Sequence, residues 1–258
     1  MTAREAIANF ELAAAIELQS TAVKRSEASD ADRLFLFELL VLGGEYEAGL
    51  DLIERLARRS GYVEGLRRWI DLVVAIEARA SLSIRPKFFA PPPKHAKYRW
   101  NLLRAERDGR ADDARRWLDR ADALTPEVRG FVDGREFSAV RETDDRFASV
   151  FEVLAGRRPA WIPFEHAKKL VLKEAEGVLD LAFRPAEVVL FDGRTVAVTV
   201  PLVGPGSHWK GDDFALGEAA DWSDSISGCC LATGAKVYVT GDDDFALNDC
   251  RMIEFRPN

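Results

Sequence analysis

A serine beside a histidine is the first arrangement in this sequence that could do chemistry. Ser207 and His208 lie in a glycine-rich loop that reads VGPGSHWKGDD. A hydrolase would use such a serine as nucleophile and the histidine as its base. The chain lacks the Gly-x-Ser-x-Gly turn that presents the nucleophile in many hydrolases, and Pro205 removes an amide donor from any phosphate cradle. We therefore expect a plain loop, with a hydrolase centre at residues 204–213 as the minor alternative.

Metal ligands do not occur at the spacing of a binding site. The histidines are His95, His166 and His208, and none has a second His or a Cys at zinc-ligand spacing. Asp242–Asp244 resembles a fragment of a calcium loop, but the rest of an EF-hand does not follow. We predict no catalytic residues, no metal and no cofactor, which favours a binding protein over an enzyme.

Charge and composition exclude several classes of protein. The chain has 258 residues and a net charge of −7, with an odd number of cysteines (three). Residues 1–126 carry 20 acidic and 21 basic side chains, so the acidity lies in the second part. An acidic chain is unsuited to phosphate contacts, and no apolar run approaches the roughly 20 residues of a membrane span. Without an evident signal peptide or disulfide framework, the sequence predicts a cytoplasmic protein that contacts neither nucleic acid nor membrane.

The first part of the chain is patterned as helices. Residues 3–25 read as one helix, and the apolar run 34–42 reads as the central, buried helix of a bundle. Two helical hairpins resemble parts of tetratricopeptide (TPR) units, in which small residues let two helices approach closely. Their residues are Gly44, Tyr46 and Gly49 in the first, and Gly109, Ala114, Ala121 and Pro126 in the second. We predict a helical, TPR-like domain over 1–126, with an irregular helical bundle as the alternative.

The patterning changes from helical to β just after this domain. Asp133 and Gly134 suit a tight hairpin because both tolerate positive φ. A short helix is predicted from Thr143 to Gly156, where an N-cap and a C-cap residue enclose apolar residues at i, i+3, i+4 and i+7. Those apolar residues are Phe147, Val150, Phe151 and Leu154.

Hairpin spacings dominate the remainder. Two alternating runs surround Asp192 and Gly193, and further strands are predicted at 161–164, 170–172, 236–240 and 251–255. Such spacings favour an α+β domain over 127–258 with a mixed or antiparallel sheet. The fold class is therefore a multidomain α and β protein.

Three aromatic residues are candidate partner contacts. Phe88 and Phe89 lie in a proline-rich segment that cannot be helical, so they either pack under the bundle or face a partner. Trp209, between His208 and Lys210, is a plausible exposed anchor, whereas Trp161 and Trp222 are expected in the core.

Several stretches together resemble one known family. They are RLFLFELL (33–40), Gly43 and YEA (46–48); FVDGREF (131–137), DDR (144–146) and VFE (150–152); WIPFE (161–165), RPA (184–186), DG (192–193), PLV (201–203) and PGS (205–207). In this order they are similar to the ImpE family, also called SciE or TagJ, accessory proteins of bacterial type VI secretion systems. The similarity runs from about residue 30 to residue 256.

This resemblance implies a non-enzymatic cytoplasmic protein. Better-known members bind the small type VI sheath subunit and are linked to the ClpV ATPase that recycles contracted sheath, and the expected contact is an amphipathic helix of that subunit. Stacked helix pairs suit that task because they present a groove. No individual site residue is carried over from the family. A general TPR-like scaffold of another bacterial complex is the alternative function.

Overall fold

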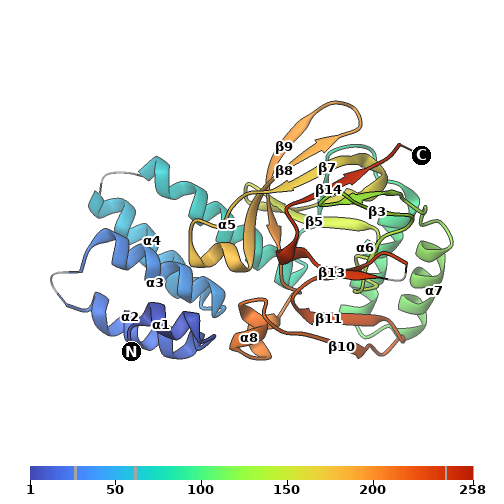
Figure 1. The fold of residues 1–258 in the computed structure, drawn as a ribbon. Coiled ribbons are helices and arrows are strands. Elements are labelled where there is room, and N and C mark those ends of the chain that lie inside the picture. Colours follow the sequence, from blue (N-terminus) through green and yellow to red (C-terminus); the bar gives the residue numbers. More distant parts are fainter. Residues whose placement is uncertain (26–27, 61–62, 242, 258) are drawn as a thin grey trace.

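The computed structural model describes residues 1–25, 28–60, 63–241 and 243–257. Helices α1–α5 stack at one end of the molecule, the strands form the other end, and helices α6 and α7 lie against the strands on the side away from the stack (Figure 1). The helices are α1 (Ala3–Ala8), α2 (Leu12–Val23), α3 (Asp30–Leu42), α4 (Tyr46–Ser60), α5 (Val63–Ser81), α6 (Lys94–Arg107), α7 (Ala111–Asp122) and the short α8 (Asp212–Ala215).

Nine strands form the main sheet, in the order β1-β6-β5-β9-β8-β7-β14-β2-β3. Every neighbouring pair is antiparallel except β1 and β6, which are parallel. The strands are β1 (Lys87–Phe88), β2 (Gly130–Val132), β3 (Arg135–Phe137), β5 (Val150–Ala155), β6 (Arg158–Pro163), β7 (Ala167–Leu172), β8 (Phe183–Leu190), β9 (Thr195–Pro201) and β14 (Met252–Phe255). This confirms an α+β chain with a helical first part and a sheet-rich second part.

Two smaller sheets complete the second part. Strands β10 (Ala220–Asp224) and β11 (Cys230–Gly234) pair with each other, and β12 (Val237–Val239) lies between β4 (Arg141–Glu142) and β13 (Asp244–Ala246). Short 3₁₀ turns connect several strands, among them η1 (Phe164–His166), η2 (Val178–Leu181), η3 (Ser207–Trp209) and η4 (Leu247–Asp249). No helix among the described residues is long and apolar enough to cross a membrane.

Local sequence signals account for several element ends. A capping box starts α3, because the Ser29 side chain accepts from the Asp32 amide while Asp32 accepts from the Ser29 amide. Asp133 and Gly134 have φ values of 46° and 84°, which confirms the predicted hairpin between β2 and β3. The single helix predicted over 3–25 is wrong, since Phe10 adopts a φ of 58° between α1 and α2.

The helix predicted from Thr143 to Gly156 is also wrong, because most of the segment is β5. The strand is buried on both faces, so its apolar residues run without a break and imitate a helical stripe. Phe151 and Val153 pack into the core of the main sheet, whereas Val150 and Leu154 face helices. A strand that is buried on both faces therefore showed the apolar spacing that is typical of an amphipathic helix.

Helices cover one face of β5 and β6 from both ends of the molecule. Leu154 belongs to the apolar cluster built by α1–α5. Val150 and Trp161 pack instead with Trp100 and Leu103 of α6. The α6–α7 hairpin thus packs on strands and does not continue the α1–α5 stack. A division into domains at residues 126 and 127 stays a prediction.

Candidate partner-binding groove and helix–sheet junction

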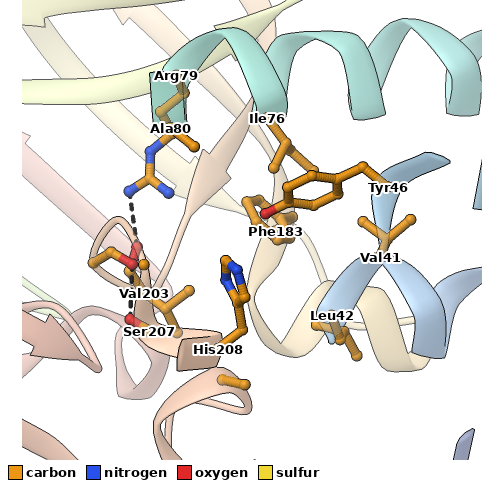
Figure 2. A pocket seen from close by; sticks show the side chains of 13 residues that line it. Val41, Leu42, Tyr46, Ile76, Arg79, Ala80, Phe183, Val203, Ser207 and His208 are labelled. Atoms are coloured by element: carbon orange, nitrogen blue, oxygen red, sulfur yellow. Dashed lines mark hydrogen bonds between the residues drawn. The ribbon is translucent and has the colours of Figure 1, made fainter. Parts of the chain in front are cut away.

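Ser207 and His208 make contacts that stabilise the local structure. Ser207 is buried; its hydroxyl donates to the Gly204 carbonyl at 2.7 Å and accepts from the Gly234 amide at 2.8 Å. His208 turns toward Tyr46, 6.0 Å between ring centroids, and burial lowers its pKa (Figure 2). No hydrogen bond joins the two side chains in the part of the chain that the structure describes. The serine therefore fixes its loop and is not oriented as a nucleophile.

The space beside His208 is too small for a substrate. The cavity between α4, α5 and the 203–208 loop holds about 20 Å³, room for about one water molecule. Gly44 packs closely on His208, because a side chain there would begin 2.3 Å from His208 Cδ2. Trp209 lies outside this contact with 80% of its surface exposed.

A buried network of charges joins α5 to the strands. Arg79 Nη2 lies 2.7 Å from Glu152 Oε2 and donates to the Val203 carbonyl at 2.9 Å. Lys236 Nζ lies 2.9 Å from Glu142 Oε1 and 3.4 Å from Glu152 Oε2. All four charged side chains are at most 5% exposed. Helix α5 is thus tied to β5 by charges that water cannot reach.

The protonation of this network follows from burial and from its partners. Burial raises the pKa of Glu142 to about 7, against the opposing effect of Lys236. Burial also acts to raise the pKa of Glu152, but Arg79 and Lys236 together hold it below its ordinary value. The Glu152 carboxylate therefore carries the charge that Arg79 and Lys236 share.

A serine, a histidine and a glutamate form a second buried chain. The Ser149 hydroxyl lies 3.1 Å from His95 Nδ1, and His95 Nε2 lies 2.6 Å from Glu165 Oε1. These residue types recur in hydrolase triads, yet Ser149 and His95 are 3% and 1% exposed. Arg99 Nε also lies 3.4 Å from the hydroxyl. These contacts hold α6 against η1 and the residue that precedes β5, and burial keeps the serine from a substrate.

A groove runs between the helical stack and the sheet. Its larger cavity, about 410 Å³, is lined by α3, α5, η2 and β8. A second cavity of about 290 Å³ adjoins it and shares Arg68, Leu72 and Thr199 with the first. Apolar side chains line the wider part: Leu34, Trp69, Leu72, Phe183 and Pro185. We call these two cavities together the α5 groove.

Glu38 fixes the wall of the α5 groove opposite α5. Its Oε2 accepts from the Val178 amide at 2.9 Å, so a helix carboxylate caps the turn η2. Gly177 must be small, because a side chain would begin 2.8 Å from that oxygen. Burial raises the pKa of Glu38. Glu38 therefore ties α3 to η2, two of the elements that line the α5 groove.

Of the predicted contact residues, Phe88 and Phe89 are neighbours in the chain and Trp209 lies apart from them. Phe88 is half-buried and packs edge-on against Trp161, 6.1 Å between ring centroids. Phe89 is half-buried against the core of the main sheet. Trp209 is exposed at the loop beside His208. Their role as partner contacts stays a prediction.

The structure tests the prediction that Trp161 and Trp222 lie in the core. Trp161 is core at 2% exposure, as predicted, but Trp222 is 46% exposed, so that prediction is wrong. Strand β10 is exposed on both faces from Asp221 to Asp224, and the Trp222 indole donates to the Thr143 hydroxyl at 2.9 Å. Asp242 lies outside the described residues, and the described part of the chain holds no group of three or more potential metal ligands.

Comparisons with known proteins identify a matching family model, a relative and a solved structure. The ImpE family model, described as ImpE protein, matches residues 134–254. The chain carries an ImpE domain. It is also 26% identical over 239 residues to the type VI secretion system accessory component TagJ of Pseudomonas aeruginosa, an alignment covering 90% of this chain and 84% of that protein. The crystal structure of protein VPA1032 from Vibrio parahaemolyticus has the same fold, with a TM-score of 0.90, 20% identity and coverage of 99% and 98% of the two chains.

The ImpE domain supplies only part of the α5 groove. Strands β8 and β9 and the turn η2 lie within residues 134–254, whereas α3 and α5 lie before them. Neither this groove nor the buried charge network of Arg79, Glu152 and Lys236 was predicted from the sequence. One signal was present: Glu152 interrupts the apolar run of β5, and a charge inside a buried strand requires a buried partner.

Proposed function

We propose that this protein is a cytoplasmic, non-enzymatic accessory component of a type VI secretion system. It binds the small sheath subunit and assists the sheath recycling that the ClpV ATPase performs. The observation that carries this proposal is the similarity to TagJ over 90% of the chain. The ImpE domain at residues 134–254 supports it independently.

The sheath subunit contributes an amphipathic helix, and the α5 groove receives it. An amphipathic helix buries apolar residues spaced i, i+3, i+4 and i+7 in a hydrophobic groove. Leu34 of α3 and Trp69 and Leu72 of α5 offer such an apolar surface. Arg68, whose guanidinium lies 4.7 Å from the Trp69 ring centroid, supplies a positive charge beside it.

The helical stack serves as a TPR-like platform in this proposal. Helices α3 and α4 form a close hairpin, in which a side chain at Gly49 would begin 3.3 Å from Val41. That close approach is what small residues provide in tetratricopeptide units. The predicted division at residues 126 and 127 is supported if limited proteolysis cuts close to residue 126 and leaves a folded fragment 1–126.

Calorimetric titration with the terminal helix of the small sheath subunit tests the proposal. Leu72 lines both cavities, so Leu72→Asp is expected to weaken binding at least thirtyfold, about 2 kcal/mol. Leu124→Asp is the matched control, because Leu124 is 49% exposed and lies outside the groove.

Trp209→Ala and Phe88→Ala separate the groove from the other candidate surfaces. If Trp209→Ala weakens binding and Leu72→Asp leaves it unchanged, the loop beside His208 is the contact surface and the groove assignment is wrong. If the full chain binds no sheath subunit, the role itself is wrong, and a scaffold of another bacterial complex replaces it.

A further inference from the structure

A basic hollow lies between the end of α5 and helix α6, apart from the α5 groove. Its volume is about 610 Å³, and it shares no lining residue with the groove. Four cationic side chains line it, together with Tyr98 and Asn101: Arg85, Lys97, Arg104 and Arg107. We call this site the basic hollow. In a chain with a net charge of −7, four cations around one hollow are unexpected.

The cations follow the geometry of α6. Lys97, Asn101 and Arg104 are spaced i, i+4 and i+7, so they share one face of the helix. Arg107 extends that face by a further turn, which makes the stripe about 15 Å long at 1.5 Å per residue. Arg85 comes from the segment after α5, so the hollow has cations on two walls.

These cations are poorly neutralised within the protein. Among the described residues, no carboxylate lies within ion-pair distance of Arg85, Lys97 or Arg104, whereas Arg107 pairs with Asp108 at 2.8 Å. Arg104 and Arg107 also repel each other, since like charges at i, i+3 on a helix are unfavourable. By contrast, Arg110, which precedes α7, and Arg116 within it both pair with Asp113. The stripe thus keeps its positive charge for an external anion.

We propose that the basic hollow binds an acidic segment of a partner protein. Carboxylates spaced over two to three turns of a helix would match the stripe, and the arginines would offer them forked hydrogen bonds. Tyr98 and Asn101 add polar or aromatic contacts between the charges. A nucleic acid fits less well, because the overall charge of −7 opposes the approach of a long polyanion.

Fluorescence anisotropy with a labelled acidic peptide tests this inference. The probe is a 20-residue helical peptide with glutamates spaced i, i+4 and i+7, beside an otherwise identical peptide with glutamines. We expect the full-length protein to bind the glutamate peptide and not the glutamine peptide. Lys97→Ala combined with Arg104→Ala is expected to weaken binding about fivefold to thirtyfold.

A matched variant controls for overall charge. Arg129→Ala combined with Arg135→Ala removes two exposed positive charges outside the hollow and should leave the affinity within twofold. Thermal unfolding of both double variants is expected to match the wild type, because all four side chains are exposed.

Three results would overturn the inference. One is no binding of the glutamate peptide by the wild type at 50 mM salt. Another is an equal loss of affinity in the control variant. The third is tighter binding of a 20-nucleotide single-stranded DNA than of the glutamate peptide, which would assign the hollow to nucleic acid.

Discussion

Removing Arg79 tests whether buried charges hold α5 to the sheet. The change Arg79→Met keeps most of the aliphatic length of the side chain and deletes the guanidinium. Glu152 then retains only Lys236, 3.4 Å away, which is already bound to Glu142 at 2.9 Å. The Val203 carbonyl also loses its 2.9 Å hydrogen bond. Above about pH 7, where Glu142 is ionised as well as Glu152, one negative charge is left in excess where water cannot reach it.

The expected loss is about 3–5 kcal/mol in the free energy of unfolding, as for other broken buried ion pairs. Arg157→Ala provides the comparison, because Arg157 joins Asp71 of α5 to the β5–β6 turn through a 3.1 Å pair. The two side chains of that pair are 56% and 25% exposed. Its loss is expected to cost at most about 1 kcal/mol.

Urea unfolding followed by circular dichroism and by tryptophan fluorescence measures both variants. A double variant, Arg79→Met with Glu152→Gln, removes the excess charge as well, so it should be more stable than Arg79→Met alone. The reasoning is refuted if Arg79→Met costs no more than Arg157→Ala, or if the added Glu152→Gln destabilises further.

Three further predictions follow from the same structure. The pKa of Glu142 is raised to about 7 in the folded protein, so the stability that this group contributes is greatest below its ordinary pKa of 4.5 and falls as the pH rises to 7. In urea unfolding, the wild type should therefore lose stability relative to Glu142→Gln between pH 5 and pH 8. A gain over this range would contradict the raised pKa. Phe88→Ala is expected to lower the free energy of unfolding by about 2–3 kcal/mol, since the ring is half-buried against Trp161. Unchanged stability with weaker partner binding would make Phe88 a contact residue instead. Ser207→Ala is expected to destabilise by about 1–3 kcal/mol through the two hydrogen bonds of its hydroxyl, and a loss of function at unchanged melting temperature would instead restore the hydrolase hypothesis.

Two tight turns could be predicted because their signals are local. The hairpin at Asp133 and Gly134 depends on two adjacent residues that adopt positive φ, and the hairpin at Asp192 and Gly193 joins β8 to β9 as expected. The β5 segment failed because its periodicity reports burial on two faces.

The candidate site could not be predicted because its contacts are distant in sequence. Glu38 caps an amide 140 residues away, and His95 reaches Glu165 across 70 residues. Neither pairing leaves a pattern in a single stretch of sequence. A charged residue within an apolar run, such as Glu152, indicates that a buried partner exists but does not say which one.

The two ends of the nine-stranded sheet have a consequence for aggregation. One outer strand, β1, has only two residues, carries the exposed Lys87 and follows Pro86. The other, β3, has three residues and begins with the exposed Arg135 and Glu136. Short, charged or proline-flanked edges prevent a sheet from pairing with another chain. The proline-rich segment before α6 therefore protects the protein against joining other sheets edge to edge, and replacing it with a longer β-branched strand would favour self-association.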